Sequence, residues 1–186
     1  MAANHATLRI LTLADMDEYL RFFNVQRLEG GVDGRPHDTP YNRDEVFDPR
    51  EHRAVTTERW ETPVHKLGWR RVWGVFEDKA LIGTASLTGH TLETTSHRAQ
   101  LGMGVLYGYH RQGLGSRLLQ TVIDWCRAEP QLCWLDLGVF HENKPAIGLY
   151  ETFGFQRLGY TPDLFRIDGV SIDDIPMTLW VGPDGA

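Results

Sequence analysis

The chain has 186 residues, of which 41% are hydrophobic and 24% are charged, and it carries a net charge of −6 at pH 7. This length and composition predict one globular domain over residues 1–186 with a sizeable core. The acidic balance argues against a nucleic-acid partner, and no run of apolar residues is long enough to span a membrane.

The amino-terminal third is predicted to form a strand, a helix and a long polar connection. Residues 6–13 have a strand pattern, and apolar residues at helical spacing predict a helix over residues 14–30. Residues 30–60 are polar and rich in turn-forming residues. Long loops in small domains are often functional, so this segment is either a variable, substrate-determining loop or a disordered surface loop.

Three strands are predicted next, over residues 69–76, 80–89 and 97–107. In the last of these, apolar side chains alternate with a second set that includes Gly102 and Gly104. Glycines on one side of a strand indicate a bulge, the close approach of a ligand, or room for a neighbouring helix.

The second half of the chain alternates helices and strands. The pattern predicts a helix, a strand, a helix, a hairpin and a last strand, over residues 115–130, 133–140, 144–155, 164–172 and 175–181. Asp168-Gly169 supplies the two-residue turn of the hairpin. Pro176 predicts that the last strand starts at a bulge or lies at an edge. The element order is that of an α/β domain with a mixed sheet.

Two cysteines, Cys126 and Cys133, match no zinc or redox spacing and are predicted to be buried, reduced thiols. The amino terminus, MAANHATLRI, lacks the basic start and apolar run of a signal peptide. Both observations favour a cytoplasmic protein.

The turn before the helix at 115–130 has the composition of an anion-binding site. The first N–H groups of a helix have no intrahelical partner and lie at the positive end of its dipole. Gly113 and Gly115 leave these donors open to a phosphate, and Arg111 and Arg117 add positive charge. The turn is neither a Rossmann fingerprint nor a Walker loop. A glycine-rich turn without a ligand is the alternative interpretation.

A second group of residues shares one face of the helix at 144–155, because the spacings between its members are three or four residues: Asn143, Ala146, Tyr150 and Phe153. Taken alone, a tyrosine at such a position is either a core aromatic or a chemical group of a site.

These two segments resemble the two signatures of the GNAT family of N-acetyltransferases. Val105 to Gly115, V-L-Y-G-Y-H-R-Q-G-L-G, is similar to the first signature. Val139 to Phe155 matches the second, V-x-x-x-N-x-x-A-x-x-L-Y-x-x-x-G-F, position for position. The resemblance covers nearly the whole chain except residues 30–60. It implies an α/β fold with a mixed, mostly antiparallel sheet that is splayed between its fourth and fifth strands and flanked by helices.

The resemblance also implies acetyl-CoA as the co-substrate, with no metal. Backbone amides of the glycine turn would hold the pyrophosphate, and the pantetheine would lie along the splayed fourth strand. The cofactor-binding residues implied in this way are Met103, Gly104, Val105, His110, Arg111, Gln112, Gly113, Leu114, Gly115, Ser116, Asn143 and Tyr150. His110 stands where the family usually has Arg or Gln, and Arg111 where glycine is common. We expect these departures to tune affinity rather than abolish it.

Tyr150 is implied to lie near the sulfur of the cofactor, and the chemistry of a phenol suits a general acid there. A tyrosine with a pKa near ~10 is protonated at neutral pH, and the leaving thiolate belongs to a thiol with a pKa near ~8.5. An N–H at or near Val105 is expected to polarise the acyl oxygen.

The general base that deprotonates the amine is not assigned. Asp136 and His97 are candidates, and carboxylates of residues 30–60 or an ordered water chain are alternatives. His90, His97 and His141 can each be explained more simply as surface or packing histidines.

Within this family, the motifs resemble most those of bacterial enzymes that acetylate small amines such as amino acids or polyamines. Gly138 stands where a carboxylate or histidine often lies in the branch that acetylates protein amino termini, which counts against that branch. Acetylation of a protein lysine or amino terminus through an open groove remains an alternative. A second alternative function is that of a non-catalytic regulator that binds acyl-CoA. The family often forms dimers, so a homodimer is a further expectation.

Overall fold

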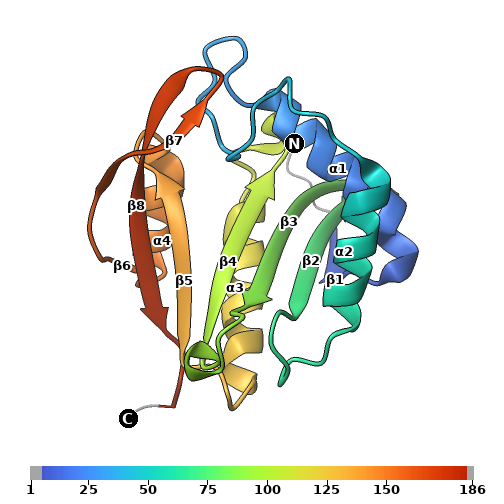
Figure 1. Cartoon of the computed structure of the whole chain (residues 1–186), viewed down its shortest axis with the longest axis vertical. Helices are drawn as coiled ribbons and strands as arrows, with labels where there is room; N and C mark the ends of the chain where they lie inside the picture. Colours follow the sequence, from blue (N-terminus) through green and yellow to red (C-terminus); the bar gives the residue numbers. More distant parts are fainter. Residues whose placement is uncertain (1–5, 184–186) are drawn as a thin grey trace.

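The computed structural model describes residues 6–183, and its eight strands form one sheet (Figure 1). The strand order is β1-β2-β3-β4-β5-β8-β6, and β7 pairs with β8. The strands are β1 (Thr7–Ile10), β2 (Arg70–Glu77), β3 (Ala80–Gly89), β4 (Arg98–Val105), β5 (Trp134–Phe140), β6 (Gln156–Arg157), β7 (Thr161–Ile167) and β8 (Val170–Trp180).

Helices cover both faces of this sheet. They are α1 (Met16–Glu29), α2 (Pro49–Glu61), α3 (Leu114–Ala128) and α4 (Lys144–Thr152). Helices α1 and α2 lie on one face, and α3 and α4 lie on the other (Figure 1). The main core lies between the sheet and α3, whose apolar side is fully buried, and a smaller core lies under α1.

The sheet opens between β4 and β5, which run parallel and pair only over Arg98–Gln100 and Trp134–Asp136. Beyond this point β4 continues to pair with β3 as far as Val105, and β5 continues to pair with β8 as far as Phe140. The two strands therefore diverge toward their carboxyl ends (Figure 1). The predicted splay between the fourth and fifth strands is confirmed.

The largest departure from the predicted elements is in residues 30–60, where Pro49–Glu61 forms helix α2. Asp48 is its N-cap and accepts a hydrogen bond of 2.8 Å from the backbone N–H of Arg50, and Pro49 lies in the first turn. The apolar periodicity is weak because the helix buries little, Thr56 being its one fully buried residue. In the sequence, the start of this helix was marked by the N-cap Asp48 followed by Pro49.

Strand β8 runs without interruption through Pro176, so the predicted bulge or edge at this residue is wrong. The carbonyl of Pro176 accepts a hydrogen bond of 2.8 Å from the N–H of Leu158, on the side of β8 away from β5. The N and C=O of one strand residue point to the same side. The side of Pro176 that lacks an N–H therefore faces away from β5, between the part of β8 that pairs with β6 and the part that pairs with β7. No hydrogen bond to β5 is lost.

The two cysteines differ in burial, and they form no disulfide with each other. Cys126 is buried, which raises the pKa of its thiol to about 12. Cys133 is partly exposed, so the prediction that it is buried is wrong. Over residues 6–183, no helix combines the length and apolar character that crossing a bilayer requires. The same residues contain no cluster of His, Cys, Asp and Glu suited to a metal ion.

Candidate active site

The turn at the carboxyl end of β4 presents a row of free backbone donors. Helix α3 begins at Leu114, with Gly113 as its N-cap in the left-handed region at φ +77°. The N–H groups of residues 111–116 donate no hydrogen bond to any described residue. A Cβ on Gly113 would meet nothing within 4 Å, so the approach to these donors is open. Neighbouring N–H groups at the positive end of a helix dipole suit a phosphate.

The two unusual residues of the turn shape it in different ways. Arg111 has φ +60°, a left-handed conformation that favours glycine, at a strain of about 1–2 kcal/mol. The ring Nε2 of His110 lies 2.7 Å from the carbonyl oxygen of Val105. Glu29 of α1 accepts a hydrogen bond of 3.0 Å from the N–H of Tyr107. His110 thus connects the turn to the end of β4, and Glu29 connects the start of the turn to α1.

The start of α3, the splayed part of β4 and α4 come together behind the turn. A Cβ on Gly115 would lie 3.3 Å from the Cδ2 of Leu149 and 3.8 Å from the Cε of Met103. In a strand, the backbone groups of alternate residues point to opposite sides. Those of β4 that face β5 beyond Gln100 therefore have no strand partner. This open edge leads from the turn toward α4.

Helix α4 contributes Asn143 and Tyr150. Asn143 is the N-cap, and its side chain accepts a hydrogen bond of 3.2 Å from the N–H of Ala146. This bond uses the amide oxygen and leaves the amide NH₂ available to a ligand. Tyr150 is 7% exposed and packs against Phe155 with ring centroids 5.6 Å apart. Burial raises the pKa of Tyr150 to about 12, so the phenol holds its proton at neutral pH.

The two predicted bases lie where β4 begins and where it pairs with β5. His97 directly precedes β4, eight residues or roughly 26 Å of extended strand from Val105. Asp136 receives two hydrogen bonds from Arg98, of 2.7 and 2.5 Å, and one of 2.7 Å from Thr178. Burial would raise the pKa of Asp136, but these hydrogen bonds and the charge of Arg98 outweigh it and lower the pKa. Asp136 therefore lies in an ion pair that stabilises its charged form.

Two glycines of β4 are covered by polar side chains from other elements. A Cβ on Gly104 would lie 1.8 Å from Nε2 of Gln26, a buried residue of α1. A Cβ on Gly102 would lie 3.1 Å from the hydroxyl of Ser86, which is 3.3 Å from a guanidinium nitrogen of Arg70. These glycines therefore make room for polar side chains on the α1 face. Gln26 and Arg70 have no signal in the sequence, because both lie far from the motifs.

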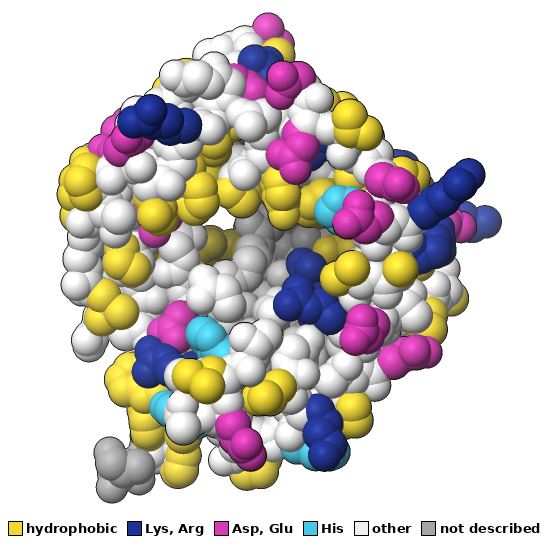
Figure 2. Space-filling view, viewed as in Figure 1, with side chains coloured by type: hydrophobic (Ala, Val, Ile, Leu, Met, Phe, Trp, Pro, Cys, Tyr) yellow, Lys and Arg dark blue, Asp and Glu magenta, His cyan; other side chains and the backbone are white. Residues whose placement is uncertain are grey.

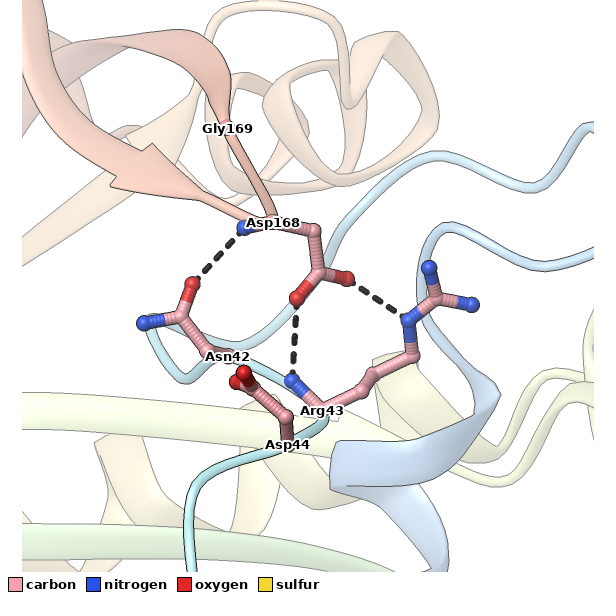
Figure 3. A pocket seen from close by; sticks show the side chains of 5 residues that line it. All are labelled: Asn42, Arg43, Asp44, Asp168 and Gly169. Atoms are coloured by element: carbon pink, nitrogen blue, oxygen red, sulfur yellow. Dashed lines mark hydrogen bonds and ion pairs between the residues drawn. The ribbon is translucent and has the colours of Figure 1, made fainter.

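A contact between two distant segments closes the rim of the same face (Figure 3). Arg43, in the connection from α1 to α2, binds Asp168 in the β7–β8 turn through its backbone N–H at 3.0 Å and its Nε at 2.6 Å. The N–H of Asp168 donates a hydrogen bond of 2.7 Å to the side chain of Asn42. These residues line a pocket of about 750 Å³ together with Asp44 and Gly169. We call this contact the rim contact.

The space-filling view shows a hollow at the centre of this face, beneath the α1–α2 connection and the tip of β7 (Figure 2). Hydrophobic side chains lie along its upper wall, and basic side chains lie over β2 and β3 (Figure 2). The hollow coincides with the splay between β4 and β5 in Figure 1. The hollow gives a molecule in solvent access to the splay from this face.

Comparisons with known proteins agree with this geometry. The model of the acetyltransferase (GNAT) family matches residues 36–155. The chain is 34% identical over 67 residues to the N-alpha-acetyltransferase RimI of Mycobacterium tuberculosis, covering 36% of this chain and 40% of that protein. It is 28% identical over 82 residues to the L-amino acid N-acetyltransferase AaaT of Escherichia coli, covering 44% of this chain and 51% of that protein. The matches thus span about half or less of these curated relatives.

A solved structure has the same fold over nearly the full length of both chains. It is the structure of yncA, a putative acetyltransferase from Salmonella typhimurium, with its cofactor acetyl-CoA. It superposes with a TM-score of 0.79 at 20% identity and covers 98% of each chain.

Proposed function

This chain belongs to the acetyltransferase (GNAT) family, and on that premise we propose that it transfers the acetyl group of acetyl-CoA to the primary amine of a small molecule. The observation that carries the proposal is the row of free N–H groups at residues 111–116, beside an open strand edge that leads to α4. A pyrophosphate followed by an extended pantetheine arm fits this arrangement in charge and in shape. The residues present therefore suit the co-substrate.

The proposed binding residues divide by the part of acetyl-CoA that they would hold. The amides of Arg111, Gln112, Gly113, Leu114, Gly115 and Ser116 bind the pyrophosphate. The free edge at Met103, Gly104 and Val105 pairs with the pantetheine, and the amide NH₂ of Asn143 donates to it. His110 acts as a positioning residue, because its ring is bonded to the carbonyl of Val105.

Tyr150 is the proposed general acid. The amine attacks the thioester carbonyl, the C–S bond breaks, and the phenol gives its proton to the sulfur of the leaving thiolate. The pKa of Tyr150, raised to about 12 by burial, keeps the phenol protonated at neutral pH. The backbone N–H at or near Val105 would polarise the acyl oxygen.

The rim contact supports a small acceptor over a protein segment. A protein lysine or amino terminus has to enter with its flanking residues in an open groove, whereas Arg43 and Asp168 join two segments across the rim. The similarity to RimI keeps a protein amino terminus as a second candidate. The rim contact weighs against it.

Arg70 favours an acceptor that carries a carboxylate, such as an amino acid, over a polyamine. Its Nε is buried with no hydrogen-bond partner among the described residues, and its Nη2 makes one long contact of 3.3 Å with Ser86. No described Asp or Glu forms a salt bridge with Arg70. By contrast, the neighbouring Arg71 donates to several backbone carbonyls. A half-buried cation with free donors attracts a carboxylate and repels a polycation.

Thiol release from acetyl-CoA, measured with a panel of amino acids, polyamines and amino-terminal peptides, tests the proposal. We expect turnover with amino acids, and an Arg70→Met variant that loses more activity with amino acids than with amines lacking a carboxylate. Turnover only with peptides would replace the small acceptor with a protein. Tight binding of CoA without thiol release from any acceptor would show a non-catalytic regulator.

A further inference from the structure

Asp174 of β8 is a mostly buried residue whose carboxylate oxygens still reach solvent and have no partner among the described residues. It is 6% exposed, and it lies opposite Phe140 in the β5–β8 ladder. No described residue donates a hydrogen bond to its side chain or forms an ion pair with it. Burial raises its pKa. Glu18 and Asp136, which are also partly buried, are each bound by an arginine.

The carboxylate lies over the backbone of β5 beside the splay. A Cβ on Gly138 would come within 2.8 Å of Oδ2 and 3.0 Å of Oδ1 of Asp174. The absence of a side chain at Gly138 therefore allows Asp174 to occupy the space that a side chain from β5 would fill. The acid group at this place comes from the neighbouring strand.

The alternation of β5 places Asp174 and Tyr150 on opposite faces of the sheet. Leu137 and Val139 point into the main core, which also contains Tyr150. Gly138, between them, faces the other way, toward the hollow under α1 and α2. Asp174 lies over Gly138 and therefore shares that face. A thioester held in the splay would have the phenol on one side and this carboxylate on the other.

We propose that Asp174 binds the ammonium group of the acceptor and takes one proton from it. The inference rests on the proposed function. An unpaired carboxylate in a buried position is unfavourable, and a cationic ligand that donates hydrogen bonds relieves that cost. A primary ammonium at this place has the charge and the three donors that Asp174 lacks.

Asp174 and Tyr150 together account for every proton that moves in the reaction. The ammonium gives one proton to Asp174, and the neutral amine forms the new C–N bond as the C–S bond breaks. Tyr150 protonates the sulfur, and the second proton on the amide nitrogen returns to the phenolate oxygen. Asp174 then releases its proton to solvent. The net products are the acetylated amine, free CoA and one proton.

The test compares Asp174→Asn with Asp173→Asn in the full chain. Asp173 is the adjacent residue, and it faces away from Asp174 and binds Tyr160 and the N–H of Asp163. We expect Asp174→Asn to lower kcat/KM by about 10²–10⁴-fold, the range for a general base. CoA affinity stays unchanged, and the melting temperature stays equal or rises, because an unpaired buried charge is removed. Asp173→Asn keeps its activity.

A second readout separates proton transfer from a structural role. Hydroxylamine is uncharged at neutral pH, so its acetylation needs no proton acceptor. After subtraction of the uncatalysed rate, Asp174→Asn should lose much less activity with hydroxylamine than with amino acids. An equal loss with both acceptors would overturn the proton-acceptor role.

The remaining outcomes are also decisive. An active wild-type protein with an equally active Asp174→Asn overturns the inference and leaves the proposed function intact. A wild-type protein that binds CoA but acetylates no acceptor refutes the proposed function itself. If both Asp174→Asn and Asp174→Ser fail to fold, the carboxylate is a structural group and the inference is wrong.

Discussion

Arg43 and Asp168 lie 125 residues apart in the chain, and the Nε of Arg43 donates a hydrogen bond of 2.6 Å to the Asp168 carboxylate (Figure 3). The contact joins the α1–α2 connection to the β7–β8 turn over the hollow of the sheet. Exposed ion pairs of this kind contribute little to stability, because water and salt screen them. We therefore expect the rim contact to shape the acceptor site more than it stabilises the fold.

Removal of the rim contact should alter acceptor selection more than stability. In an Asn42→Ala/Arg43→Ala variant, we expect the KM for a small acceptor to rise severalfold, while the free energy of unfolding changes little. Steady-state kinetics and urea denaturation measure the two effects. Arg166→Ala breaks an ion pair with Asp163 inside the same hairpin and should leave the KM unchanged. Equal KM values in all three proteins would show that the rim contact does not shape the site.

Gly113→Ala should weaken CoA binding by about tenfold or more. The substitution meets no atom within 4 Å, but it strains a φ of +77° in the row of free donors. Gly68→Ala is a matched control, since Gly68 has φ +76° with nothing within 4 Å and lies in the α2–β2 connection. Both variants should lose similar stability, about 1 kcal/mol. Calorimetric titration measures the affinity of each variant for CoA. Equal affinities in the two variants would contradict the pyrophosphate site.

Tyr150→Phe should lower kcat by about 10²–10⁴-fold with little change in CoA affinity, because the acid is lost and the aromatic packing stays. Tyr160→Phe removes an exposed hydroxyl that binds Asp173, and it should keep wild-type turnover. Thiol-release assays on both variants make the comparison. Undiminished turnover in Tyr150→Phe would identify Tyr150 as a packing residue only.

Asp38 should make the protein less stable as pH rises through the range from about 4 to 6. Burial raises the pKa of Asp38 to about 6, so the folded state holds its proton more tightly than the unfolded state, whose pKa is ~3.9. Above pH 6 the folded protein carries the full cost of the buried charge. At pH 7, Asp38→Asn should raise the free energy of unfolding by about 1–3 kcal/mol.

Urea denaturation at pH 4.5, 5.5 and 7 checks this prediction, with the exposed residue Asp33 of the same connection as the control. Asp33→Asn should leave the pH dependence unchanged. An Asp38→Asn variant whose stability follows the wild-type pH profile would contradict a raised pKa.

Patterns among nearby residues were enough to predict the parts of the protein that depend on neighbours along the chain. The free donors at residues 111–116 follow from two glycines at a helix start, and the shared face of Asn143 and Tyr150 follows from helical spacing. The motifs therefore predicted the family and the splayed sheet. Helix α2 escaped prediction because it exposes most of its side chains, although the Asp48-Pro49 cap marked its start.

Contacts between residues far apart in the chain depend on strand register and on how the chain crosses itself, and local patterns did not predict them. The ion pair between Asp136 and Arg98 had no signal in the sequence, because it depends on the pairing of β4 with β5. Asp174 had no signal of its own, since its place over Gly138 depends on which strand lies next to β5 and in which register. Local spacing cannot predict such neighbours, because their positions result from the packing of the whole sheet.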